Sequence, residues 1–180
     1  MSKDIQLSDS DGDVLVKTAR KAVTEFLSNG NRMKLEPDLE KKFSFNSGVF
    51  VTLNNPEGLR GCIGFPMPDK KLSRAIVDGA IAAATEDPRF SPVTMKELDN
   101  IVFEVTVLTP PVEIDVSDPM EYLSKIKVGR DGLIIRHSFS SGLLLPQVPV
   151  EYGWNVEEFL QHTCEKAGLA RDTWKNESVK

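Results

Sequence analysis

Apolar residues recur with the period of an α-helix in two long stretches of the chain. The first covers residues 14–27 and is followed by Asn29-Gly30, a pair that favours the end of a helix. The second covers residues 72–83, where alanines and a glycine form a stripe suited to close packing. We expect this second helix to be capped by Asp69 and to end just before Pro88, because proline disfavours helical geometry in the residue preceding it.

A period of two replaces the helical spacing in other parts of the chain. Residues 43–54 alternate between apolar and polar positions and lead through an Asn-Asn-Pro-Glu-Gly turn into residues 59–65, which predicts a β-hairpin. Residues 101–108 alternate again and predict a third strand that ends at two prolines. Two apolar runs within residues 127–149 are typical of a second hairpin.

Capping signals mark shorter helices. Thr94 and Glu97, like Asn155 and Glu158, have the spacing of a capping box, and Pro119 favours a helix start. Residues 34–42 are charged and predict an irregular segment.

This mixture of antiparallel hairpins and helices predicts an α+β fold, an antiparallel sheet flanked by helices. The 180 residues fit one domain with a smaller second lobe, and the polar residues 1–9 are expected to be disordered.

Charge and composition narrow the classes of function. The chain has 22 Lys and Arg against 27 Asp and Glu, a net charge of −5, which argues against nucleic acid as a partner. Its two cysteines and its polar N-terminal residues indicate a cytoplasmic protein without a disulfide framework. No apolar stretch approaches the length of a membrane span, so we expect no membrane association.

The segment LRGCIGF, residues 59–65, places an arginine and a cysteine two positions apart, each beside a glycine. Alternate side chains of a strand share a face, so Arg60 and Cys62 are expected on one side. A neighbouring cation favours the thiolate, and Gly61 and Gly64 allow a ligand or another backbone to approach closely. The pattern predicts a binding strand with Cys62 as candidate nucleophile; a buried structural cysteine is the alternative.

Partners for a catalytic cysteine are few. Only His137 and His162 are available as a base, and neither is close to Cys62 in the sequence. Cys164 lies on the apolar face of the last predicted helix, and a disulfide between Cys62 and Cys164 is a minor alternative. No Cys and His residues have metal-ligand spacing and no phosphate-binding glycine loop is present, so we expect neither a metal nor a cofactor.

Two further segments carry candidate binding residues. TEDPRFSP contains Asp87 and Arg89 at the end of a predicted helix; alternatively, Asp87 accepts backbone hydrogen bonds in a turn and Arg89 pairs with a carboxylate. In LLPQVP, Gln147 is the one polar side chain of an extended segment that two prolines stiffen, and a structural crossover is the alternative.

Three stretches, taken in order, resemble the AMMECR family along nearly the whole chain: GVFVTL with LRGCIGF, AIAAATEDPRFSP, and GLLLPQVPVEYGW. The LRGCIG signature is the hallmark of that family. The resemblance implies an α+β fold with a smaller second lobe and a cleft between the lobes, near the signature. It also implies Memo-like or radical-SAM-type proteins as partners and a regulatory role. The resemblance does not define a biochemical activity.

Two functional hypotheses follow, and whether the protein is an enzyme stays open between them. In the first, a cleft around Arg60 and Cys62, with Arg89, binds a small anionic or carbonyl ligand and uses the thiol on it. In the second, the same strand and the LLPQVP segment form a non-enzymatic surface for a partner protein or RNA.

Overall fold

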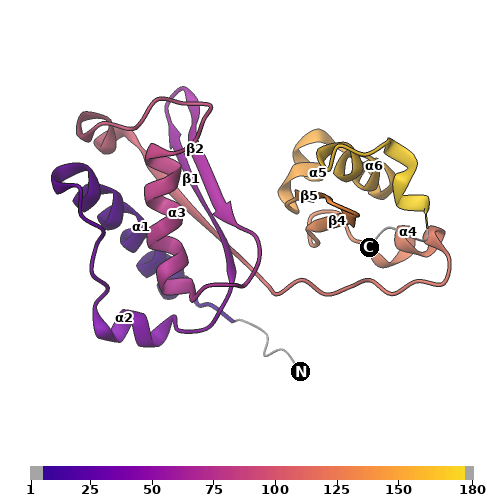
Figure 1. Cartoon of the computed structure of the whole chain (residues 1–180), viewed down its shortest axis with the longest axis horizontal. Coiled ribbons are helices and arrows are strands. Elements are labelled where there is room, and N and C mark those ends of the chain that lie inside the picture. The colour runs from indigo at the N-terminus through magenta and orange to yellow at the C-terminus, as the bar shows by residue number, and fades with distance from the viewer. Residues whose placement is uncertain (1–5, 177–180) are drawn as a thin grey trace. The chain divides into compact units, whose positions relative to one another are not determined.

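The computed structural model describes residues 6–176, and its internal contacts divide the chain into two units, Met1–Pro110 and Pro111–Lys180 (Figure 1). Each unit has its own hydrophobic core. Helices and antiparallel sheets occur together, which confirms the α+β prediction. None of the helices formed by residues 6–176 is long and apolar enough to span a membrane.

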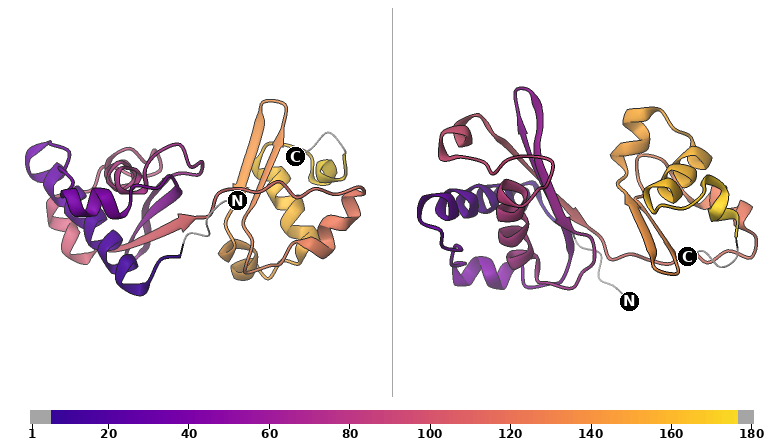
Figure 2. Two further views of the ribbon diagram at one scale, coloured as in Figure 1. Left: turned by 90° about the horizontal axis from the view of Figure 1, so that it is seen from below. Right: turned by 45° about the horizontal axis from the view of Figure 1, so that its top comes forward.

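The first unit is a three-stranded antiparallel sheet with helices on one face (Figures 1 and 2). Its strands are β1 (Gly48–Asn55), β2 (Gly58–Phe65) and β3 (Val102–Leu108), in the order β2-β1-β3. The helices α1 (Asp9–Asn29) and α3 (Leu72–Thr85) pack on the face that carries the buried side chains of β1, namely Val49, Val51 and Leu53. The alternation in the sequence therefore corresponds to a sheet with one buried face, which carries these apolar positions, and one outer face.

Helix α1 begins earlier than its apolar periodicity indicates. Ser8 caps it through a capping box with Asp11, so polar residues of the predicted disordered segment 1–9 enter the helix; residues 1–5 lie outside the described part. The helix ends at Asn29, and the φ of +76° at the following Gly30 is the left-handed conformation that glycine adopts without strain.

Helix α3 corrects one prediction, because Lys71 and not Asp69 precedes its first residue. The amide groups of Leu72 and Ser73 donate to the backbone carbonyls of Phe45 and Phe43. Since the segment before β1 satisfies these first amides, the helix begins without a side-chain cap.

Two segments predicted to be irregular or extended are helical. Helix α2 (Pro37–Lys42) forms in the charged segment 34–42, with its proline in the first turn, where no amide donor is needed. Helix α5 (Gln147–Tyr152) begins within LLPQVP and continues past it, and Pro149 is accommodated because it also lies in the first turn. The prediction of an extended LLPQVP segment was wrong because a proline is also tolerated in the first turn of a helix.

The second unit packs short helices on a hairpin of β4 (Leu133–His137) and β5 (Ser140–Leu144). Helix α6 (Val156–Lys166) has the predicted capping box of Asn155 and Glu158. The remaining elements are η2 (Pro119–Glu121), α4 (Tyr122–Lys125) and η3 (Arg171–Lys175). Phe159 and Trp174 are fully buried at the centre of this unit.

Candidate functional site

A β-bulge lies within the LRGCIG strand. Gly61 pairs with Leu53 of β1, but the next pair is Leu59 with Asn54, so Arg60 is the extra residue on β2. A bulge interrupts the alternation of side chains. Leu59 therefore lies on the opposite face from Gly61, and Arg60 does not occupy the regular position beside Cys62 that simple alternation predicts.

The guanidinium of Arg60 is bound to the loop before β3. Its Nε lies 2.9 Å from Glu97 Oε1, and its Nη1 and Nη2 lie 2.8 and 3.4 Å from the carbonyl oxygens of Ser91 and Pro92. Its hydrogen bond, together with those from Thr94, holds the pKa of Glu97 below its ordinary value. Only 11% of the Arg60 side chain is exposed, so its donors are used within the protein.

A second arginine reaches Cys62 itself from the loop after α3. The Cys62 amide donates to Asp87 Oδ2 at 2.9 Å, and Arg89 Nη2 lies 3.4 Å from the Cys62 carbonyl oxygen. Arg89 also pairs with Asp87 at 2.7 Å. Because β2 is an edge strand, these two side chains satisfy backbone groups that no neighbouring strand meets.

The exposure of this ion pair is uneven. The Asp87 side chain is 2% exposed, whereas that of Arg89 is 54% exposed. The Arg89 hydrogen bond, together with the backbone amides of Cys62 and Arg89, holds the pKa of Asp87 well below its ordinary value. Asp87 is therefore a buried anchor, while the Arg89 side chain is half exposed.

Three polar side chains form one row across the outer face of the sheet. Thr52 of β1 pairs with Cys62 of β2 on one side and with Glu104 of β3 on the other. The Thr52 hydroxyl donates to Cys62 Sγ at 3.2 Å, and the cysteine is partly exposed. The row thus presents a thiol, a hydroxyl and a carboxylate on the face that α1 and α3 leave uncovered (Figure 1).

Gly61 and Gly64 allow close approach on opposite faces of β2. A Cβ on Gly61 would lie 2.1 Å from the carbonyl oxygen of Ala83, so this glycine lets α3 approach the strand. A Cβ on Gly64 would lie 2.3 Å from the ring of Phe50, which extends across it on the outer face. Phe50 therefore forms an apolar wall next to the row of polar side chains.

Comparison with known proteins places this arrangement in a family. The AMMECR1 family model matches residues 16–180. The chain belongs to the AMMECR1 family. Among curated family members, protein PYRAB00100 of Pyrococcus abyssi is 50% identical over 180 residues, covering 97% of this chain and 87% of the relative. Protein MJ0810 of Methanocaldococcus jannaschii is 52% identical over 172 residues, covering 94% and 85%.

A solved structure supports the fold of this AMMECR1 family member. The crystal structure of the uncharacterized protein PH0010 from Pyrococcus horikoshii has a TM-score of 0.90 to this chain at 49% identity. The match covers 97% of this chain and 88% of that one. Membership of the AMMECR1 family, expected from the sequence, is confirmed. The names of these relatives state no biochemical activity.

The fold gathers most of the predicted site residues around β2. Arg60, Gly61, Cys62 and Gly64 lie on the strand, and Asp87 and Arg89 close its edge. The alternative turn interpretation of TEDPRFSP describes the observed bonds of Asp87 and Arg89. Gln147 is exposed at the start of α5, which belongs to the second unit.

Residue type alone does not single out Thr52 and Glu104 as site residues. A regular hairpin with its turn at residues 56–57 would place Thr52 opposite Gly61, and the bulge at Arg60 shifts this partner to Cys62. Adding the third strand places Glu104 in the same row. Cross-strand neighbours have Cβ atoms about 5 Å apart, which is close enough for their side chains to act on one ligand.

Other candidate groups lie outside this site. His137 and His162 both belong to the second unit, where His162 Nδ1 lies 2.7 Å from Glu165 Oε2. Cys164 is fully buried, and its burial raises the pKa of the thiol. Within residues 6–176 no three His, Cys, Asp or Glu side chains are grouped to hold a metal ion.

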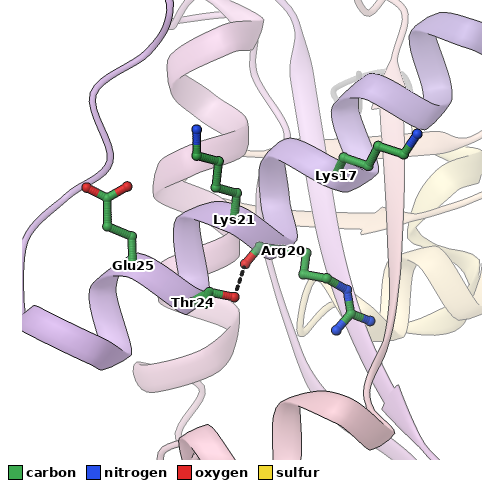
Figure 3. Close-up of a pocket in the computed structure, with 5 residues that line it drawn as sticks. All are labelled: Lys17, Arg20, Lys21, Thr24 and Glu25. Atoms are coloured by element: carbon green, nitrogen blue, oxygen red, sulfur yellow. Dashed lines mark hydrogen bonds between the residues drawn. The ribbon is translucent and has the colours of Figure 1, made fainter.

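A shallow depression on α1 is not a convincing binding site (Figure 3). It is lined by Lys17, Arg20, Lys21, Thr24 and Glu25. The Arg20 guanidinium donates to the carbonyl oxygens of Leu98 and Ile101 and stacks over Phe103 at 4.7 Å. This arginine fastens α1 to the start of β3, and the two lysines alone define no ligand.

Proposed function

We propose that this AMMECR1 family member binds a small anionic or carbonyl ligand on the outer face of β2, beside Cys62. The supporting observation is that Cys62 is partly exposed and that its backbone carbonyl oxygen lies 3.4 Å from Arg89 Nη2, on a side chain that is half exposed. Arg89 attracts the anionic group of the ligand, and Cys62 is the candidate nucleophile. Arg60 contributes by fixing the loop that follows Arg89.

Addition of the Cys62 thiol to a carbonyl ligand needs few other catalytic groups. The Cys62 thiolate adds to the carbonyl carbon and forms a carbon–sulfur bond, while the carbonyl electron pair moves to the oxygen. The resulting alkoxide takes a proton from water, and the hydroxide left behind balances the proton that the thiol released. The Thr52 hydroxyl, 3.2 Å from the sulfur, stabilises the thiolate by hydrogen bonding.

Two alkylating reagents of nearly equal size test the charge preference of this site. Iodoacetate is anionic and iodoacetamide is neutral, and both modify the thiolate. We expect Cys62 to favour iodoacetate about two- to fivefold relative to a small free thiol such as N-acetylcysteine amide, because a nearby guanidinium concentrates anions. Mass spectrometry of the Cys62 peptide of the folded protein gives both rates.

Two matched variants test whether Arg89 causes the preference of Cys62 for iodoacetate. Arg89→Gln is expected to remove the preference for iodoacetate, whereas Arg130→Gln is expected to leave it unchanged. Arg130 is a fair control, since it also pairs with an aspartate and its side chain is 58% exposed. Failure of Cys62 to react in the folded protein, or equal preference in wild type and Arg89→Gln, overturns the proposed site.

A partner-binding function is the second candidate, and a feature of the second unit favours it. Phe139 at the tip of the β4–β5 hairpin is fully exposed, and Ser138 beside it has a φ of +53°, which is uncommon for serine. An exposed aromatic on a tight turn suits insertion into an apolar pocket of a partner protein. Pull-down of a Memo-like protein by wild type and not by Phe139→Ser supports this candidate; equal recovery by both contradicts it.

A further inference from the structure

Glu104 is an exposed carboxylate at the end of the row that begins with Cys62. In the part of the chain from residue 6 to residue 176, no hydrogen bond or ion pair engages its side chain. The other carboxylate near this row, Asp87, is buried and paired with Arg89. Glu104 is thus the carboxylate of this face that is free to meet a ligand.

The row has opposite charges at its two ends. Neighbouring strands lie about 4.8 Å apart, so Cys62 and Glu104, separated by one strand, are about 10 Å apart across the sheet. Arg89 reaches the Cys62 end from beyond the edge of β2. Between the two charges lie the Thr52 hydroxyl and, in the next row, the apolar ring of Phe50.

We propose that this face binds an amino-carboxylate, a molecule with an anionic group at one end and a protonated amine at the other. The anionic group pairs with Arg89, the amine pairs with Glu104, and the apolar part of the ligand lies against Phe50. This proposal rests on the proposed function above, since it uses the same Arg89 and Cys62, and it adds the recognition of a cationic group at Glu104.

The charge pattern also argues against the simplest anionic ligands. A dicarboxylate long enough to cross the row would place its second carboxylate next to Glu104, where like charges repel. A zwitterion of the same length replaces that repulsion by attraction. The difference between these two ligands isolates the contribution of Glu104, because their common carboxylate makes the same contact with Arg89.

Protection of Cys62 from iodoacetamide measures binding without knowledge of the natural ligand. The probes are 6-aminohexanoate, hexanoate, hexylamine and adipate, which share a chain length and differ in their charged ends. We expect 6-aminohexanoate to reach half-protection at a concentration about two- to fivefold lower than hexanoate, the size of effect typical of one exposed ion pair. Hexylamine and adipate are expected to protect less than hexanoate.

Substitutions of Glu104 decide between recognition and a merely solvated side chain. Glu104→Gln is expected to make 6-aminohexanoate and hexanoate equal, and Glu104→Lys to reverse the order so that adipate protects best. A reversed preference cannot arise from unfolding. Glu57→Gln, an exposed change in the turn between β1 and β2, is the control and should keep the wild-type order.

The outcomes separate this inference from the proposed function. Equal protection of the wild type by hexanoate and 6-aminohexanoate overturns the amino-carboxylate proposal and leaves anion binding at Arg89 in place. A preference for 6-aminohexanoate that survives in Glu104→Gln also overturns it. Absence of protection by any carboxylate, in a protein whose Cys62 reacts freely, overturns both.

Discussion

The inner and outer faces of β2 differ in what their side chains leave accessible. On the inner face, Gly61 brings the strand against the backbone of α3, and no room remains for a ligand. On the outer face, Cys62 is partly exposed and its neighbour Thr52 directs a hydroxyl to the sulfur. One short sequence therefore places a closely packed glycine and an accessible thiol on opposite faces of the strand, as strand alternation dictates.

The two arginines near this strand differ in the same way, since one is mostly buried and the other is accessible. Arg60 satisfies three acceptors and is 11% exposed, whereas Arg89 keeps 54% of its side chain accessible while it holds Asp87. The arginine two positions before the cysteine binds the segment that precedes β3, whereas the one from a more distant segment contacts the backbone carbonyl of Cys62. Proximity along the chain is thus a poor guide to which cation approaches the cysteine.

A substitution that adds a side chain on the inner face of β2 should have the largest effect on the stability of the protein. Gly61→Ala places a Cβ within 2.1 Å of a backbone oxygen of α3, and backbone cannot move aside as a flexible side chain does. We expect a loss of about 2–3 kcal/mol in the free energy of unfolding. Urea denaturation monitored by circular dichroism measures it.

The same substitution elsewhere provides the control for that experiment. Gly12 lies within α1 with nothing within 4 Å of its would-be Cβ, so Gly12→Ala should stabilise the protein by about 0.5–1 kcal/mol. A stability of Gly61→Ala equal to wild type would mean that β2 and α3 are not in the close contact described.

Acid should weaken the edge of β2 through Asp87. Its pKa in the folded protein lies below the ordinary value, so the charged form contributes stability at neutral pH and loses it as the pH falls below about 4. Asp87→Asn is expected to cost about 2 kcal/mol at pH 7, because it removes a charged partner of Arg89. The difference from wild type should shrink towards pH 2.

Urea unfolding at pH 7, 4 and 2.5 follows this convergence. Asp99→Asn is a suitable control, since Asp99 is exposed and makes no described hydrogen bond or ion pair. Other carboxylates with lowered pKa values retain part of the acid sensitivity in the variant; they are Asp11, Glu97 and Asp131. A destabilisation by Asp87→Asn that is the same at pH 7 and 2.5 contradicts the ion pair.

Much of the fold follows from patterns within single segments. Hydrophobic periodicity identified α1, α3 and the three strands of the first sheet, and the capping boxes at Thr94 and Asn155 form as predicted. The start of α3 was wrong because its first amides bind carbonyl groups of Phe43 and Phe45, far away in the sequence. Such tertiary capping leaves no local signal.

The candidate site was predicted less completely, for a similar reason. The cysteine, the glycines and the TEDPRF segment could be identified from residue type alone, but the contacts among them depend on register and on loop closure. The bulge at Arg60 moves its guanidinium to the Ser91 loop, and no residue before it signals that insertion. Glu104 joins the row only through a strand more than 40 residues away.

The smallest predicted effect concerns the outer face. Thr52→Val keeps a β-branched side chain in β1 and removes only the hydroxyl that donates to Cys62 Sγ, so the free energy of unfolding should change by less than about 1 kcal/mol. Alkylation of Cys62 by iodoacetamide should nevertheless slow about threefold, because the lost hydrogen bond stabilises the thiolate.

Thr106→Val, on the same face one row away, provides the comparison, since no described hydrogen bond joins Thr106 to the cysteine. It should leave the alkylation rate unchanged. Equal slowing by both variants would indicate a general change of the outer face and would remove Thr52 from the site. Slowing by Thr52→Val alone, at near wild-type stability, would show that the outer face acts on the sulfur independently of the packing that holds the inner face closed.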